Sequence, residues 1–244
     1  MRHEEYKKIS DGGEKAILFI HGIIGTPRHF DRFVSLVPEH YSVHNVLLDG
    51  HGKGVREFAE TSMKKWEAQI DDAVEALAVS HKEIYIVGHS MGTLLAIEQA
   101  VKNRKVTKLF LLAVPMRVMA KSKSWINVRK VRRGNITPED QEAYMMQQAC
   151  GVTMERNPLR YLGWIPRYME LFVKIGRTKK LVGLLQIPCQ VFQSRKDELV
   201  LRRSAKCLMK NPKIQVEELQ NSGHYRYAEE DWAHLSAAFE KMLG

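Results

Sequence analysis

The sequence predicts an α/β fold with a mostly parallel central sheet, because two kinds of segment alternate along it. Short apolar runs of strand-like composition fall at 16–20, 43–48, 84–88, 109–114, 190–194 and 214–219. Four of these runs are almost continuously apolar, which is typical of strands buried on both faces of a parallel sheet. Between the runs, apolar residues recur every three or four positions, as they do on one face of a helix. Alternation of this kind defines the α/β class.

Three helices are expected from this spacing. Residues 64–80 place Trp66 and Ile70 on one helical face, and residues 90–103 read as a second helix. A third apolar stripe begins at Trp232 and continues to the C-terminus. Each of these helices therefore has an apolar side that can cover the sheet.

The alternation stops between residues 115 and 185. This segment has helix-like patterning, contains no strand-like run, and is interrupted by glycines and prolines. About 70 residues are too many for an ordinary connection between two strands. We therefore expect a helical cap at 115–185, inserted into a core made of residues 1–114 and 186–244.

The positive charge of the chain is concentrated in this expected cap. The whole sequence has 38 Lys and Arg against 28 Asp and Glu, a net charge of +10. Residues 117–180 hold 14 basic and 5 acidic side chains, which leaves 24 against 23 elsewhere. Such a surface either is simply solvated or attracts an anionic membrane surface or a negatively charged substrate. The basic runs lack interleaved aromatic residues, so no nucleic-acid partner is expected.

Several other classes of protein are excluded by composition. The three cysteines, Cys150, Cys189 and Cys207, are widely spaced and predict neither a disulfide framework nor a zinc site. No metal-binding motif and no glycine-rich nucleotide loop is present, so we expect no cofactor. No apolar stretch follows the charged N-terminus, and no run is long enough to span a bilayer. The expected location is the cytoplasm.

A G-x-S-x-G motif, Gly88-His89-Ser90-Met91-Gly92, joins the run at 84–88 to the helix expected after it. A serine on a tight turn from strand to helix projects its hydroxyl, and the flanking glycines let two backbone segments approach closely. The start of the helix also supplies free N–H groups that favour a negative charge. The motif therefore predicts a nucleophile at Ser90.

Two further segments complete a family pattern: LFIHGIIGTPRHF at 18–30 and DGHGKG at 49–54. With the serine motif, they make the chain resemble the α/β-hydrolases, most of all small bacterial carboxylesterases and monoacylglycerol lipases. The resemblance covers residues 15–115 and 186–242 and implies an α/β-hydrolase fold. It also implies an oxyanion hole formed by the backbone N–H groups of Ile23 and Met91.

A serine nucleophile requires a base, and on this fold the base follows the acid in the chain. Only two histidines follow Ser90, namely His224 and His234. His224 lies in a loop after the run at 214–219, where the base is expected, whereas His234 lies within the C-terminal helix. We therefore expect His224 to be the base.

The acid should lie just after the run at 190–194, and Asp197 does, with Glu198 beside it as the alternative. Its role would be to fix the imidazole tautomer of the base. Other histidines in the glycine motifs are expected to make structural hydrogen bonds rather than transfer protons: His21, His51 and His89.

Together these features predict a cofactor-free serine hydrolase that cleaves small-molecule carboxylic esters of short to medium chain length, with monoacylglycerols among the candidates. The reaction would pass through an acyl-enzyme on Ser90. The same residues would also serve an acyltransferase, a thioesterase or an amidase. A non-catalytic module that binds a ligand on the same fold is the remaining alternative. The sequence indicates no oligomeric state.

Overall fold

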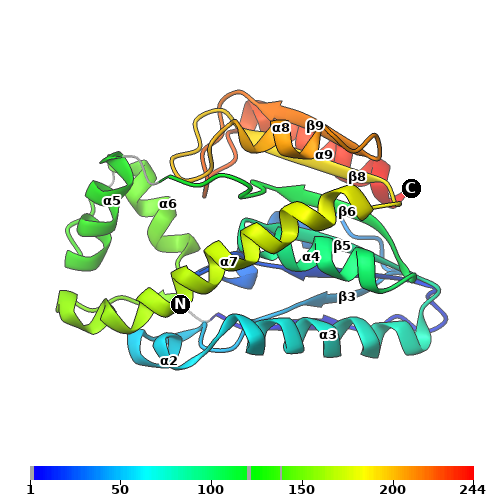
Figure 1. Ribbon diagram of the computed structural model, residues 1–244, viewed down its shortest axis with the longest axis horizontal. Helices are drawn as coiled ribbons and strands as arrows, with labels where there is room; N and C mark the ends of the chain where they lie inside the picture. Colours follow the sequence, from blue (N-terminus) through cyan, green and yellow to red (C-terminus); the bar gives the residue numbers. More distant parts are fainter. Residues whose placement is uncertain (1–2, 120–121, 138) are drawn as a thin grey trace.

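A seven-stranded sheet forms the centre of the computed structural model (Figure 1). From one edge to the other, its strands are β1 (Tyr6–Lys8), β3 (Ser42–Asn45), β2 (Lys15–Ile20), β5 (Glu83–His89), β6 (Val106–Leu112), β8 (Cys189–Ser194) and β9 (Ile214–Leu219). All neighbouring strands are parallel except β1, which is antiparallel to β3. The structure describes residues 3–119, 122–137 and 139–244, so small parts of the N-terminal segment and of the expected cap lie outside the described residues.

Helices cover both faces of the sheet. One face is covered by α3 (Met63–Ser80), α4 (Met91–Lys102) and α7 (Ile165–Leu181), which lie in front of the sheet in Figure 1, and the other by η1 (Pro27–Phe30), α1 (Asp31–Val34) and α9 (Glu229–Leu243). Strand β2 contributes to both cores in alternation: Leu18 packs with Trp66 on the first side, and Phe19 packs with Phe239 on the second. This two-sided burial explains the continuous apolar runs.

The predicted α/β class, the six strands and the three helices are confirmed, with boundaries that shift by a few residues. Strand β1 was not expected. Its residues, Tyr6, Lys7 and Lys8, are exposed or half-buried at the edge of the sheet, so they carry no apolar pattern. Short polar strands are common at sheet edges because they discourage pairing with another chain.

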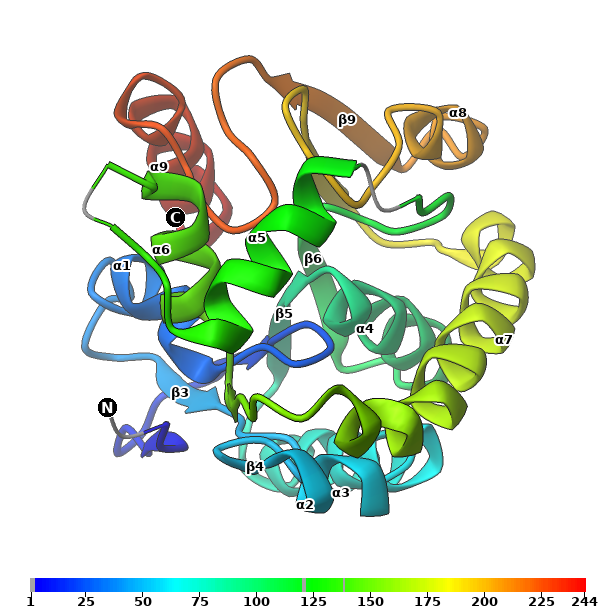
Figure 2. The ribbon, with the colours of Figure 1, turned by 90° about the vertical axis from the view of Figure 1, so that its left-hand side faces the viewer.

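The segment from 115 to 185 connects β6 to β8. It contains α5 (Ser122–Arg133), α6 (Gln141–Ala149), β7 (Val152–Thr153), η2 (Pro158–Trp164), α7 and η3 (Val182–Leu184). Figure 2 shows α5 crossing in front of β5 and β6 at one end of the sheet, with α6 beside it on the side of α1. The expectation that this segment contains no strand is wrong, because β7 pairs in parallel with β4 (Lys53–Gly54). A pair of two-residue strands is too short to give a periodic pattern in the sequence.

Helix α7 is fixed to the rest of the fold by polar contacts on its inner side. The buried Lys174 ammonium forms ion pairs with Glu67 of α3, at 2.6 Å, and with Glu98 of α4. At the start of the helix, the indole Nε1–H of Trp164 donates to the carbonyl oxygen of Val55 at 2.9 Å, in α2 (Val55–Glu60). Because a buried ammonium without its carboxylates is strongly destabilising, this arrangement fixes the rotation of α7 about its own axis.

The first turn of α4 lies directly against the end of β2. At Gly92, a Cβ atom would overlap the carbonyl oxygen of Ile20 and approach that of His21 to 2.7 Å. Neither obstacle is a flexible side chain, since both are backbone atoms of a buried strand end. Gly92 therefore permits an approach that every other residue type would prevent.

We expect Gly92→Ala to lower the free energy of unfolding by about 3 kcal/mol, because backbone must shift to accommodate the methyl group. The matched control is Gly176→Ala in α7, where a Cβ would meet no atom within 4 Å. The control should raise stability by about 0.5–1 kcal/mol, since alanine favours the helix. Denaturant unfolding of both variants tests this, and similar effects of the two substitutions would contradict the contact at Gly92.

Candidate active site

Ser90 lies on a strained turn between β5 and α4. Its backbone has φ 51° and ψ −120°, an unusual conformation for a residue with a side chain. Such a conformation costs about 1–3 kcal/mol and persists only where neighbouring contacts impose it. Here the N–H of Ser90 donates to the carbonyl oxygen of Leu112 at 2.9 Å, and the N–H and hydroxyl of Thr93 donate to the carbonyl oxygen of Ser90 at 3.0 and 2.6 Å.

Two further glycines make room for this turn. A Cβ at Gly88 would lie 2.8 Å from the Cα of Thr93, and a Cβ at Gly22 would lie 2.9 Å from the Cβ of Ser90. Both distances are shorter than ordinary van der Waals contacts. The glycines before and after Ser90 in the motif, and the one in the loop after β2, therefore have the same function: they let three backbone segments meet at the serine.

His224 and Asp197 form a buried pair in the loops after β9 and β8. The imidazole Nδ1–H donates to Asp197 Oδ2 at 2.8 Å, and both side chains are almost completely buried. The other carboxylate oxygen, Oδ1, accepts from the N–H groups of Leu199 and Val200 at 2.8 and 2.7 Å. These bonds fix the carboxylate, and the carboxylate in turn fixes the tautomer and orientation of the ring.

The pair stabilises its own charge. Burial favours the neutral carboxyl, but the nearby His224 and the backbone donors outweigh it, so the pKa of Asp197 is lowered. Burial likewise favours the neutral ring, but the charge and the hydrogen bond of Asp197 raise the pKa of His224 above its ordinary value of 6.5. A histidine of this kind is a stronger base than a free one.

The alternative acid, Glu198, and the other candidate histidine, His234, make different contacts. Glu198 accepts a hydrogen bond from the backbone N–H of His224 at 3.1 Å, so it contacts the main chain of that residue, and burial raises its pKa. His234 is exposed on α9, where its ring pairs with Glu217 at 2.5 Å. Asp197, rather than Glu198, is therefore the carboxylate on the imidazole, and His224 is the histidine near Ser90.

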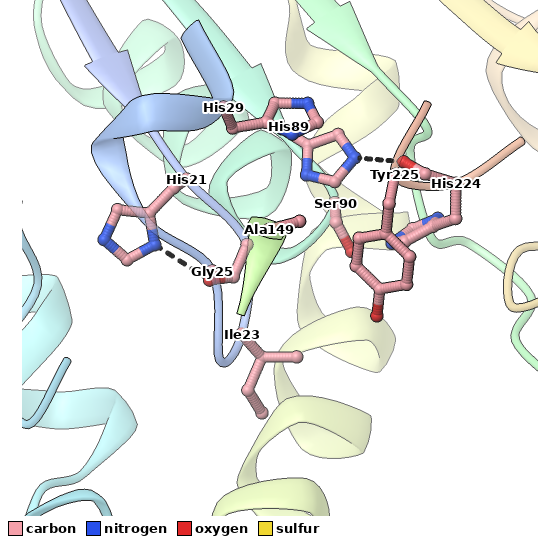
Figure 3. Close-up of a pocket in the computed structure, with 10 residues that line it drawn as sticks. His21, Ile23, Gly25, His29, His89, Ser90, Ala149, His224 and Tyr225 are labelled. Atoms are coloured by element: carbon pink, nitrogen blue, oxygen red, sulfur yellow. Dashed lines mark hydrogen bonds between the residues drawn. The ribbon is translucent and has the colours of Figure 1, made fainter. Parts of the chain in front are cut away.

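Ser90 and His224 line one small pocket, and Figure 3 shows the Ser90 side chain pointing toward the His224 ring. The pocket encloses about 10 Å³, which is room for roughly one water molecule. The remaining lining residues come from the loop after β2, from the chain around Ser90 and His224, and from the end of α6: His21, Gly22, Ile23, Gly25, His29, His89, Ala149 and Tyr225. The site thus combines segments that are far apart in the sequence.

The two expected oxyanion donors, Ile23 and Met91, lie next to this pocket in two different segments of the chain. Ile23 is part of its lining, in a loop whose next residue, Ile24, has a positive φ of 50°. Met91 is fully buried, directly follows Ser90 and is the first residue of α4. Within the described chain, neither backbone N–H donates to a protein acceptor. Both groups are therefore free to bind a negatively charged oxygen.

Neutral histidines surround His224. The Nε2–H of His89 donates to the carbonyl oxygen of His224 at 3.0 Å, and the ring of His29 stacks on that of His89 with centroids 3.8 Å apart (Figure 3). Burial and neighbouring histidines lower the pKa of His29 to about 3 and that of His89 well below its ordinary value. His89 therefore positions the backbone of His224 without competing for protons. His21 also makes a structural hydrogen bond, in which its Nε2 accepts from the N–H of Leu48 at 3.2 Å.

Three lining residues were not identified from the sequence: His29, Ala149 and Tyr225. Tyr225 adjoins His224 and could have been suspected for that reason alone. Ala149 lies outside every motif, and His29 lies within the segment 18–30 but was assigned no role there. The positions of both depend on how η1 and α6 pack.

The described residues contain no group of three or more His, Cys, Asp or Glu side chains arranged to hold a metal ion. In the same part of the chain, no helix combines the length and the apolar character needed to cross a bilayer.

Fold and site together define an α/β hydrolase. The model of the alpha/beta hydrolase family matches residues 17–238, and the chain belongs to this family. Among curated proteins, no relative matches the sequence.

Three solved structures illustrate the likeness, which at these identities is one of fold. The monoacylglycerol lipase of Paleococcus ferrophilus has a TM-score of 0.72 and 16% identity, with 100% of this chain and 99% of that chain covered. A structure from work on the metagenome-derived lipolytic enzymes LipS and LipT has a TM-score of 0.70 and 19% identity, with 98% of each chain covered. A structure from work on carboxylesterases of Nitrososphaera gargenis has a TM-score of 0.67 and 14% identity, with coverage of 98% and 94%.

We expect Asp197→Asn to lower the pKa of His224, because burial then acts on the ring without the opposing carboxylate charge. The imidazole would remain neutral to lower pH than in the wild type. Glu198→Gln is the matched control and should lower the same pKa less, since Glu198 contacts only the backbone N–H of His224. NMR titration of the His224 ring measures both shifts. A larger decrease in Glu198→Gln would mean that Glu198 is the dominant charge on the imidazole.

Proposed function

We propose that this protein is a serine hydrolase that cleaves carboxylic esters of short to medium acyl chain through an acyl-enzyme on Ser90. The observation that carries the proposal is the convergence of the strained Ser90 and the Asp197-paired His224 on one pocket. A hydroxyl needs such a base to become a nucleophile at neutral pH. Each chemical role has a residue of suitable type, burial and partner.

In the proposed reaction, His224 removes the proton of the Ser90 hydroxyl as the oxygen attacks the ester carbonyl. Asp197 stays ionised, since its pKa is lowered, and stabilises the imidazolium that forms. The N–H groups of Ile23 and Met91 bind the oxyanion of the tetrahedral intermediate. His224 then protonates the departing alcohol, and a water molecule releases the acyl group by the same steps in reverse.

Among the solved structures of similar fold, a deformylase of Pseudomonas putida S16 represents another activity, and several ester hydrolases support ester hydrolysis. They include a monoacylglycerol lipase, lipolytic enzymes and carboxylesterases, and also Est1E of Butyrivibrio proteoclasticus with ferulic acid bound. An enol-lactonase of Burkholderia xenovorans has the same architecture. Since one fold accommodates several substrates, the residues around the pocket must select the ester.

We propose that residues 115–185 act as the cap that makes this selection. Ala149, the last residue of α6, lines the pocket, and the hydroxyl of Ser124 in α5 donates to the carbonyl oxygen of Glu198 at 3.2 Å. The pocket is small, about 10 Å³, and Ala149 of α6 forms part of its wall, so α6 is placed to limit which acyl groups reach Ser90.

We expect Ser90→Ala and His224→Ala each to lower kcat by about three orders of magnitude or more, because nucleophile and base act as a unit. Hydrolysis of p-nitrophenyl esters and monoacylglycerols of increasing chain length measures this and identifies the preferred acyl group. His234→Ala, which changes the exposed histidine on α9, should retain full activity. A loss of less than about tenfold in either site variant would rule out the assigned roles.

We expect a fluorophosphonate reagent to add a single adduct, on Ser90, and to inactivate the protein irreversibly. Intact mass and peptide mapping locate the adduct, and the Ser90→Ala variant serves as the unlabelled control. Labelling elsewhere would refute the mechanism, whereas an unlabelled wild-type protein would favour the ligand-binding module.

A further inference from the structure

A stripe of exposed apolar side chains runs along η2 and α7, which follow each other without a break. Each member exposes between 52% and 69% of its surface: Leu159, Leu162, Ile165, Met169, Phe172 and Val173. Successive members are mostly three or four residues apart, so they share one side of the helical segment. Single exposed apolar residues are common in proteins, but six large ones on one side of a helical segment are not. We refer to these residues as the η2–α7 stripe.

The stripe cannot be buried by rotation of the helix. On the other side of α7, Leu171 and Ile175 are buried in the core, and Lys174 is held by Glu67 and Glu98. Rotation of α7 would remove the Lys174 ammonium from both carboxylates and expose the core residues. The fold therefore holds the stripe at the surface.

Positive charge borders the stripe. Residues 154–184 contain seven Lys and Arg but only two acidic residues. Both acidic residues are half-buried and already paired, Glu155 with Arg160 at 3.7 Å and Glu170 with Arg167 at 2.6 Å. The exposed basic residues of this region are Arg156, Arg160, Arg177, Lys179 and Lys180. The surface is thus apolar along its length, with exposed cations near its two ends.

We propose that the η2–α7 stripe docks on an anionic lipid surface. An apolar stripe with flanking Lys and Arg is the arrangement by which a helix lies in the interface of a membrane, with its apolar side chains between the headgroups and its cations against them. The same charge argues against a second copy as the occupant, because two segments of net charge +9 (14 basic and 5 acidic residues at 117–180) repel each other. The inference does not depend on the hydrolysis proposed above.

The first test compares vesicles of phosphatidylcholine with vesicles that also contain about one-third phosphatidylglycerol. Co-sedimentation of the full-length protein should show at least about tenfold tighter binding to the anionic vesicles at low salt. Binding should weaken between about 0.05 and 0.5 M salt, as the screening length falls below ~5 Å. Equal binding to both kinds of vesicle would overturn the proposal.

The second test separates the apolar and the charged contributions. Met169→Gln combined with Phe172→Gln should weaken binding to anionic vesicles at least about tenfold, because the inserted side chains become polar. The matched control, Val79→Gln with Met209→Gln, changes two side chains that are 88% and 65% exposed but lie outside the stripe. This control should bind as the wild type does. If both pairs bind as the wild type does, or weaken binding equally, the stripe is not the docking surface.

Charge reversal provides the complementary comparison. Lys179→Glu with Lys180→Glu should abolish the preference for anionic vesicles, whereas Lys8→Glu with Lys241→Glu, in β1 and α9, should preserve it. Equal losses in the two pairs would mean that net charge alone drives binding, which would overturn the proposal. Thermal unfolding of every variant verifies that it is folded, which is expected because the substituted side chains lie at the surface.

Light scattering tests the second copy as occupant. If the wild type is a dimer, and the substitutions at Met169 and Phe172 produce a monomer with unchanged vesicle binding, then the stripe is an interface between copies and the proposal fails. A monomeric wild type with the vesicle preference described above supports it.

Discussion

The approach of α4 to the end of β2 is the constraint on which the candidate site depends. Because Gly92 lets the first turn of α4 lie against the carbonyl oxygens of β2, the chain must reverse direction sharply at Ser90. That reversal directs the Ser90 side chain toward His224, and within the described residues the N–H of Met91 at the start of the helix donates to no protein acceptor (Figure 3). It also brings the loop after β2, with Ile23, to the same place. One backbone contact thus positions Ser90 and both expected oxyanion donors.

A second constraint is electrostatic. Four histidines line the pocket, yet only His224 has a buried carboxylate on its ring. Burial alone lowers the pKa of a histidine, as it does for His29 and His89, so the surroundings suppress protonation everywhere except where Asp197 opposes them. Of the four rings, His224 is therefore the one with a raised pKa. The remaining rings fill space and make hydrogen bonds without adding charge to the site.

Much of this arrangement could be predicted from the sequence, for identifiable reasons. Buried parallel strands leave continuous apolar runs, so the central strands were found, and the G-x-S-x-G motif with the order of acid and base indicated Ser90, Asp197 and His224. Strands β1 and β7 were missed because two or three residues are too few to carry a periodicity. His29 and Ala149 were missed because tertiary packing alone brings η1 and α6 to the pocket. Local pattern reveals elements and motifs, but not which distant segments meet.

The hydroxyl of Ser124 in α5 donates to the carbonyl oxygen of Glu198, and the carboxylate of Glu198 accepts the backbone N–H of His224. Residues 197 and 198 therefore make contacts with α5 and His224. Glu198 bonds to α5 and to the main chain of His224, and Asp197 bonds to the His224 ring. Two hydrogen bonds and the chain of Glu198 thus link α5 to the backbone N–H of His224. Any movement of α5 would therefore act on the backbone of His224, whereas the bonds of Asp197 to Leu199 and Val200 hold the orientation of the ring.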